Sequence, residues 1–213
     1  MVIRIALAFS ALAAALVVPA QAGTLSDQAA PAAAATATTS SEEAPKADLV
    51  HVALDTAKGR ILLALDRGRA PVSTANFLRY VDARRFDGST FYRAMPYGED
   101  NGLIQGGITR DARLLFPPIA HEPSSRTGIG HEAGTILFAH TGPGTARADF
   151  FITLGPIPFG DDFAPFGRVV EGLEVVRAIF ASPTDPNRGT GAMKGQMLVE
   201  PVTIRTARRV TQP

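Results

Sequence analysis

The segment Thr90-Phe-Tyr-Arg-Ala-Met-Pro96, closing on Gln105-Gly-Gly107, sets a single arginine among apolar and aromatic residues. The amide side chain of Gln105 follows Arg93 by twelve positions. A guanidinium does not lose its proton in proteins, and an amide both donates and accepts hydrogen bonds. This combination suits a site that binds and polarises a neutral peptide group without attacking it.

A second apolar block, Ala148-Asp-Phe-Phe-Ile-Thr153, follows further along the chain. Neighbouring residues of a β-strand face opposite sides of the sheet. We therefore expect one of Phe150 and Phe151 to pack in a core and the other to line a surface or pocket.

Hydrophobic periodicity predicts a mainly β domain with two helices. Pro71 favours the start of a helix that ends near Asp82, and a second helix is predicted from Glu171 or Gly172. In the last strand, Val202, Ile204 and Thr206 are expected on one side. The predicted strands cover residues 50–54, 61–65, 90–93, 103–105, 135–139, 150–153 and 198–206. Many short strands with two helices favour a closed antiparallel barrel capped by helices, although periodicity alone does not separate a barrel from a sandwich.

Several collinear motifs between Val50 and Val210 resemble the cyclophilin family of peptidyl-prolyl isomerases. Besides Phe91-Tyr-Arg93 and Gln105-Gly-Gly107, they are Pro71-Val-Ser-Thr-Ala-Asn-Phe77, Ala139-His-Thr-Gly-Pro143 and Phe166-Gly-Arg-Val169. The resemblance implies a closed eight-stranded antiparallel barrel capped by two α-helices. It also implies an isomerase that acts on X-Pro bonds of polypeptides, assists their folding, and needs neither a cofactor nor a metal.

The resemblance also implies the site residues. Arg93 is expected to stabilise the twisted amide, and Gln105 to bind the substrate carbonyl and place the guanidinium. Substrate contacts are implied for Phe91, Leu103, Ala139, His140, Phe151, Phe159 and Phe163.

The chain departs from the family between Pro96 and Gln105, where its loop is about four residues longer. Gly102 stands where the family has a pocket phenylalanine, and Tyr97 could fold back to replace that ring. Asp149 replaces a glutamine and could pair with Arg93 or cap a turn. The alternative interpretation is therefore a proline-peptide binding or chaperone module with weak catalysis.

The N-terminal residues indicate export. Arg4 is the only charge in residues 1–22, an apolar run follows it, and Ala20-Gln-Ala22 matches a cleavage pattern. The run falls short of the ~20 apolar residues that span a bilayer. We expect a signal peptide over 1–22, a low-complexity Ala/Thr/Pro linker over 23–47 and the isomerase domain over 48–210. The expected product is an exported, periplasmic monomer that is free of the membrane, with a surface-tethered interaction protein as an alternative.

Charge and cysteine content exclude other classes. Removal of Arg4 from the 21 basic residues leaves 20 against 20 acidic ones, which argues against nucleic-acid binding. The chain has no cysteine, hence no disulfide or thiolate site. Neither His121-Glu122 nor His131-Glu132 fits a metal motif, so both dipeptides are expected to be exposed polar surface.

Overall fold

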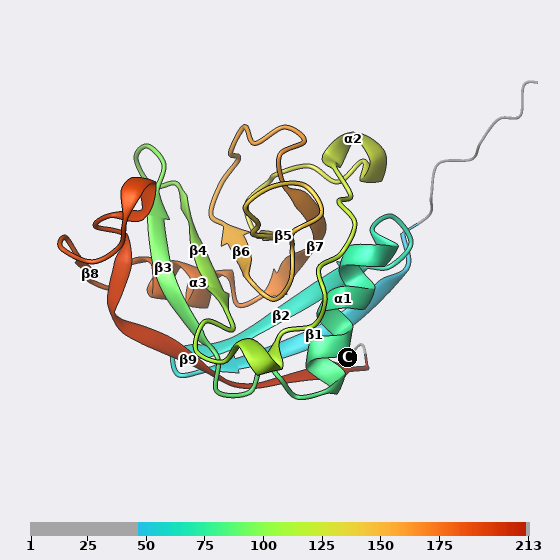
Figure 1. Ribbon diagram of the computed structural model, residues 1–213, viewed down its shortest axis with the longest axis horizontal. Coiled ribbons are helices and arrows are strands. Elements are labelled where there is room, and N and C mark those ends of the chain that lie inside the picture. Colours follow the sequence, from blue (N-terminus) through green and yellow to red (C-terminus); the bar gives the residue numbers. More distant parts are fainter. Residues whose placement is uncertain (1–46, 212–213) are drawn as a thin grey trace, which may run out of the picture. The chain divides into compact units, whose positions relative to one another are not determined.

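The structure is a computed structural model that describes residues 47–211, and the chain forms a closed β-barrel (Figure 1). Eight strands form the ring in the order β1-β2-β7-β5-β6-β4-β3-β9, and β9 pairs back onto β1. All pairings are antiparallel, and the two-residue strand β8 adds to the outside of β9. The strands are β1 (Leu49–Thr56), β2 (Gly59–Asp66), β3 (Thr90–Pro96), β4 (Gly102–Gly107), β5 (Thr135–Phe138), β6 (Phe150–Thr153), β7 (Ala164–Glu171), β8 (Thr184–Asp185) and β9 (Met197–Val210).

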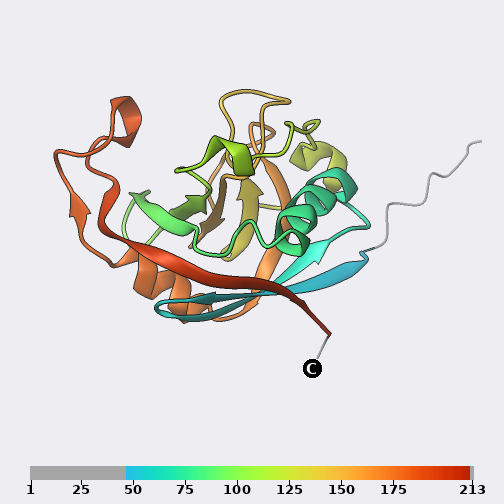
Figure 2. The same cartoon turned by 60° about the horizontal axis from the view of Figure 1, so that its bottom comes forward.

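The described residues also form three α-helices and two 3-10 helices. They are α1 (Pro71–Asp82), α2 (Ser124–Thr127), α3 (Leu173–Phe180), η1 (Ala112–Leu114) and η2 (Gly191–Met193). Figure 2 shows α1 and α3 on opposite sides of the barrel. The prediction of an eight-stranded antiparallel barrel with two main helices is confirmed.

The expected signal peptide and all but the last residue of the expected linker lie outside the described residues. Within residues 47–211, every helix is too short or too polar to cross a membrane.

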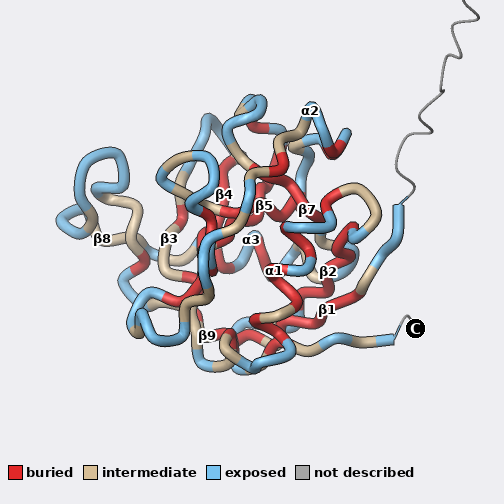
Figure 3. The backbone as a smooth tube through the Cα atoms, turned by 45° about the vertical axis from the view of Figure 1, so that its right-hand side comes forward, coloured by how far each residue is buried: buried red, intermediate tan, exposed pale blue. Residues whose placement is uncertain are grey.

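A cluster of phenylalanines fills the barrel beneath α1. Phe77 of α1 lies 4.8 Å from Phe86, 5.3 Å from Phe150 and 5.5 Å from Phe166, measured between ring centroids. All four rings are fully buried. Figure 3 shows the same distribution along the chain, with buried segments in the strands and on α1, and exposed loops around them. Phe150 is thus the core member of the Phe150-Phe151 pair.

The N-terminus of α1 is capped from a distant part of the chain. Its flanking residue, Ala70, has no side chain that could accept the free N–H groups of the first turn. The buried Glu122 carboxylate takes this role, accepting from Val72 N at 3.1 Å and Ser73 N at 2.6 Å. Arg126 pairs with the same carboxylate at 3.3 Å. The expectation that Glu122 is exposed polar surface is therefore wrong, because its charge serves the helix.

A β-bulge changes the phase of the last strand. Asp55 pairs with Thr206, but the next residue of β1, Thr56, pairs with Ile204. The extra residue turns Thr206 away from the core and places Ala207 inside it. Outside the core, the Thr206 hydroxyl donates to the Asp55 carboxylate at 3.1 Å. Val202 and Ile204 face the core as predicted, whereas the prediction for Thr206 is wrong.

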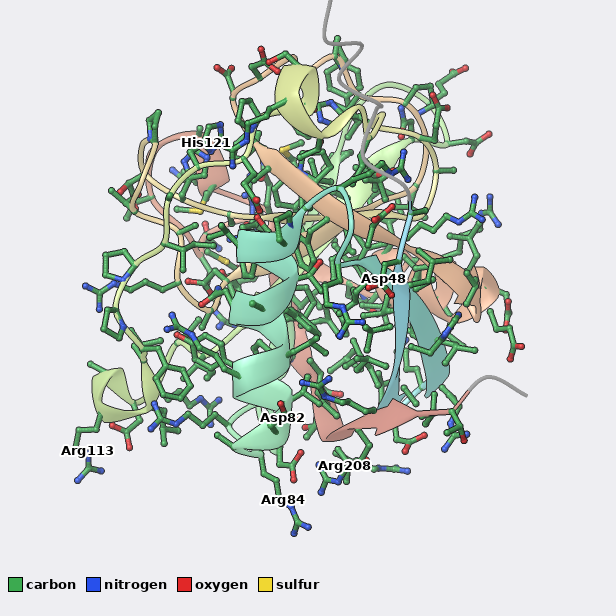
Figure 4. All side chains as sticks on the ribbon, turned by 90° about the vertical axis from the view of Figure 1, so that its right-hand side faces the viewer. Asp48, Asp82, Arg84, Arg113, His121 and Arg208 are labelled. Atoms are coloured by element: carbon green, nitrogen blue, oxygen red, sulfur yellow. The ribbon has the colours of Figure 1, made fainter. Side chains whose placement is uncertain are left out.

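Two of the arginines near the C-terminus form ion pairs at the end of α1. Arg208 binds the Asp87 carboxylate through two nitrogens at 2.8 Å, and Arg209 binds Asp82 at 2.6 and 2.7 Å. Figure 4 shows Asp82 and Arg208 close to the last turn of α1. Their positive charge is matched locally, so these two residues do not form an unpaired basic patch.

Candidate functional site

Strand pairing brings Arg93 and Gln105 together. They are direct partners in the antiparallel β3–β4 pair, so their side chains project from the same face of the barrel. A bulge between Phe91 and Arg93 on both neighbouring ladders re-aims the arginine. The two side chains border a pocket of about 300 Å³. Its lining residues are Arg93, Met95, Leu103, Gln105, Ala139, His140, Thr141, Asp149, Phe151, Phe159, Phe163 and Met193.

Two glutamines hold the guanidinium. Arg93 Nη1 donates to Gln105 Oε1 at 2.7 Å, whereas Nε and Nη2 donate to Gln196 Oε1 at 2.8 and 2.6 Å. A guanidinium has five N–H donors. The described residues therefore engage three, and two remain for a ligand in the pocket.

The arginine keeps its full charge in a partly buried place. No carboxylate of residues 47–211 lies within 4.0 Å of it, and both of its partners are neutral amides. Burial lowers the pKa of Arg93 from its ordinary value, but a guanidinium remains protonated at any physiological pH. The pocket thus presents a fixed positive charge with free donors to its contents.

Behind Gln105 the hydrogen bonds continue to a partly buried carboxyl group. Gln105 Nε2 donates to the Tyr92 hydroxyl at 2.8 Å, and that hydroxyl donates to Asp149 Oδ1 at 3.2 Å. Asp149 therefore pairs with Tyr92, and the hypothesis of an Arg93–Asp149 pair is wrong.

Burial shifts both titrating groups of this chain of hydrogen bonds. It raises the pKa of Asp149 from 3.8 to about 6, an effect that the hydrogen bond from Tyr92 partly opposes. The pKa of Tyr92 is also raised, first by burial and then by the charge of Asp149. Tyr92 accordingly stays protonated and can serve both neighbours.

Aromatic rings form the apolar part of the pocket. Phe151 on β6 lies 5.5 Å from Phe159 and 5.1 Å from Phe163, and the latter two rings are 4.8 Å apart. All three contacts are edge-to-face, the arrangement that aromatic rings favour. Phe151 packs with Leu103 and Ile157 in a cluster separate from the barrel core. The result is a compact apolar wall facing the Arg93 side chain.

Ala139 and His140, just after β5, complete one edge of the pocket. The His140 ring lies 5.1 Å from Phe163 and 5.2 Å from His121. Burial lowers the pKa of His140, and the nearby His121 acts in the same direction. This edge is therefore neutral at physiological pH.

Phe91 is the one expected substrate contact that the structure does not bring to the pocket. Its side chain is fully buried in the barrel interior, with its ring 5.7 Å from Phe150. The expected contact between Phe91 and substrate is corrected to a core role, because the residue faces inward from β3.

The altered loop does not restore the ring that is missing at Gly102. Tyr97 is 45% exposed and does not line the pocket. A side chain at Gly102 itself would meet the Met95 carbonyl oxygen and, at 2.5 Å, the Phe180 ring of α3. The close approach of α3 thus requires glycine here, and Phe159 and Phe163 supply the pocket rings.

Sequence reasoning missed several pocket residues. Met95, Thr141 and Met193 line the pocket, and Gln196 holds the arginine from behind. Met95 follows from the alternation of β3, since it lies two residues after Arg93. Gln196 carries no comparable signal, because its place depends on how a distant loop packs on β3.

Several known proteins are similar to this chain in sequence. The family model described as cyclophilin type peptidyl-prolyl cis-trans isomerase/CLD matches residues 50–208. The peptidyl-prolyl cis-trans isomerase cyp18 of Streptomyces antibioticus is 34% identical over 169 residues, which cover 74% of this chain and 96% of the relative. Isomerase A of Dickeya dadantii is 35% identical over 145 residues, covering 63% and 73%.

Solved structures share the fold. A cyclophilin type isomerase of Cryptosporidium parvum superposes with a TM-score of 0.64 at 19% identity, covering 78% of this chain and all of that one. The structure of that protein in the presence of the dipeptide Ala-Pro gives a TM-score of 0.61 at 19% identity, covering 76% and 99%.

Proposed function

This chain belongs to the cyclophilin-type peptidyl-prolyl cis-trans isomerases, and we propose that Arg93 drives X-Pro rotation in exported polypeptides. The observation that carries the proposal is a charged guanidinium beside an apolar pocket, with two N–H donors that no residue of 47–211 engages. Through this activity the protein assists the folding of its substrates.

The barrier defines what the site has to do. Rotation about a peptide bond costs ~18–20 kcal/mol because the nitrogen lone pair is delocalised into the carbonyl. In the twisted amide that lone pair is localised on the proline nitrogen, which becomes a better hydrogen-bond acceptor. A guanidinium aimed at this nitrogen binds the twisted state more strongly than either planar isomer, and such differential binding accelerates the reaction.

One hydrogen bond is too weak to account for efficient catalysis. Shortening an exchange of ~100 s to about a millisecond requires roughly 7 kcal/mol. A hydrogen bond from a charged donor contributes about 1.5–3 kcal/mol. We assign the rest of the reduction in the barrier to positioning of the substrate. The ring of the substrate proline packs against Phe151, Phe159 and Phe163, and Gln105 binds the substrate carbonyl.

Replacement of the arginine tests this mechanism. Arg93→Ala is expected to lose most of the catalysed cis-to-trans exchange in a short X-Pro peptide, while its thermal unfolding midpoint stays close to that of the wild type. Arg93→Lys is the matched variant, since it keeps the charge but lacks the planar donors that Gln105 and Gln196 hold. Full activity in Arg93→Ala would disprove the mechanism.

Export is the second part of the proposal and is supported by residues 1–22 alone. We expect cleavage after Ala22, release into the periplasm and a monomeric mature protein that is not attached to the membrane. Mass spectrometry of the N-terminus of protein isolated from the producing cell tests this. An intact Met1 on a membrane-bound product would refute export in soluble form.

A binding module with weak catalysis is the alternative, and the exposure of Tyr97 favours it. Tyr97 does not line the pocket, so it does not replace the phenylalanine that the family has at the position of Gly102. A peptide titration alongside the exchange assay separates the two functions. Saturable binding of an X-Pro peptide without faster exchange would establish the alternative.

A further inference from the structure

The loop between β8 and β9 reaches the back of the candidate active site. It runs outside the barrel beside β3, and η2 lies near the β3–β4 hairpin (Figure 1). Gln196 is its last residue before β9. The oxygen of this side chain accepts from Arg93 Nε at 2.8 Å and from Nη2 at 2.6 Å.

The Gln196 amide is itself fixed. Its Nε2 donates to the Ala192 carbonyl at 2.9 Å, so the oxygen faces the guanidinium. Its backbone accepts from Ala94 N at 3.0 Å and donates to Met193 O at 3.2 Å. The loop and strand β3 therefore hold this residue from both sides.

The two glutamines restrain the guanidinium differently. Gln105 accepts one bond from Nη1, and a single bond leaves the plane of the guanidinium free to rotate about it. Gln196 accepts two bonds along the opposite edge, which fixes that plane. Both acceptors are neutral, so the guanidinium is oriented without loss of its net charge.

We propose that Gln196 is a positioning residue for the isomerase reaction, which orients Arg93 from a loop outside the barrel. The inference rests on the proposed role of Arg93. The same loop also contributes Met193 to the pocket wall. The conformation of this loop therefore sets both the orientation of the Arg93 guanidinium and the shape of one side of the pocket.

The test compares variants of the full chain. Gln196→Met has nearly the same length but no acceptor, and Gln196→Glu restores an acceptor. Lys194→Ala is the matched control, because Lys194 is exposed in the same loop and makes no side-chain hydrogen bond to residues 47–211. Arg93→Ala is measured in parallel. The readouts are kcat and KM on an X-Pro peptide, and water exchange of the Arg93 Nε–H in ¹⁵N-labelled protein.

We expect Gln196→Met to lose kcat by roughly 10- to 100-fold with little change in KM, as misplacement of a catalytic group does. Its Arg93 Nε–H should exchange faster than in the wild type. Gln196→Glu should restore the slow exchange and part of the activity, since a carboxylate keeps the geometry but offsets the charge. Lys194→Ala should match the wild type in both measurements.

Several results would overturn the inference. The first is a Gln196→Met variant with the kcat of the wild type when Arg93→Ala is inactive. This result would refute the role of Gln196 but leave the proposed function of Arg93 intact. Others are lost activity with an Nε–H that is still protected, or a glutamate variant no better than the methionine variant. If Gln196→Met fails to fold, the wild type alone decides, because an Arg93 Nε–H that exchanges as fast as those of exposed arginines contradicts the geometry. Full activity in Arg93→Ala would instead refute the proposed function.

Discussion

At the scale of single residues, Asp149 is a partly buried carboxyl group that accepts a hydrogen bond from Tyr92 and forms no ion pair within residues 47–211. Burial raises its pKa from 3.8 to about 6. A raised pKa means that folding favours the protonated form. The wild type is thus stabilised at this site below pH 4 and loses that contribution as the pH rises through about 6.

Asp149→Asn removes this pH dependence, because an amide does not titrate. A shift of about two pKa units corresponds to roughly 3 kcal/mol, which is the upper limit of the gain. We expect the variant to have a higher free energy of unfolding than the wild type at pH 7.5 and a similar one at pH 4. Urea unfolding at both pH values measures this. If Asp149→Asn exceeded the wild type in free energy of unfolding by the same amount at pH 4 and pH 7.5, the pKa of the carboxyl group would not be raised.

Residues of the pocket were predictable where a motif defines them. The family resemblance predicts Arg93, Gln105 and Phe151 from the motifs in which they stand, and all three line one pocket. The Tyr92–Asp149 hydrogen bond joins residues 57 positions apart, and the Arg93–Gln196 hydrogen bonds join residues 103 positions apart. No local pattern encodes such contacts, so their hydrogen bonds could not be predicted.

At the scale of elements, helix α1 depends on a carboxylate from outside it. Glu122→Ala would leave the N–H groups of Val72 and Ser73 without their acceptor, at a cost of about 1–3 kcal/mol each when buried. We expect a loss of roughly 2–4 kcal/mol in the free energy of unfolding. Chemical denaturation of the purified variant measures it.

Glu132→Ala is the matched control for this prediction, because Glu132 belongs to the second His-Glu dipeptide and is exposed. It is expected to change the free energy of unfolding by less than about 0.5 kcal/mol. Equal effects of the two substitutions would contradict the capping role of Glu122.

Elements with a regular pattern were predicted from the sequence, and irregular ones were not. Helix α1 has the predicted bounds, from the proline that favours its first turn to Asp82. Strand β7 was not predicted, because its first four residues are all buried and include Pro165 and Gly167, which hide any alternation. The bulge in β9 was missed for a related reason, since register follows from pairing with β1.

At the scale of the whole molecule, the barrel is closed by the pairing of β1 with β9. The closed form was predicted from the family resemblance and not from periodicity, which does not encode which strands pair. A chain ending at Glu200 would lose the β9 residues that pair with β1 and the buried side chains of Val202, Ile204 and Ala207. Open strand edges promote association between chains.

We therefore expect the chain ending at Glu200 to lose cooperative unfolding and to aggregate, as measured by circular dichroism and light scattering. A chain ending at Val210 is the control and should unfold like the full-length protein, since β9 is intact. A cooperative transition near the wild-type midpoint in the shorter chain would show that closure contributes little to stability.

Closure of the barrel by β1 and β9 also has a consequence for folding. Until β9 is in place, β1 and β2 can pair, but β1 and β3 each lack the neighbour that β9 provides. A chain in which β9 has not yet paired therefore presents two open strand edges. Gln196 directly precedes β9, so the two hydrogen bonds that it accepts from Arg93 require the loop before β9 to be packed on β3.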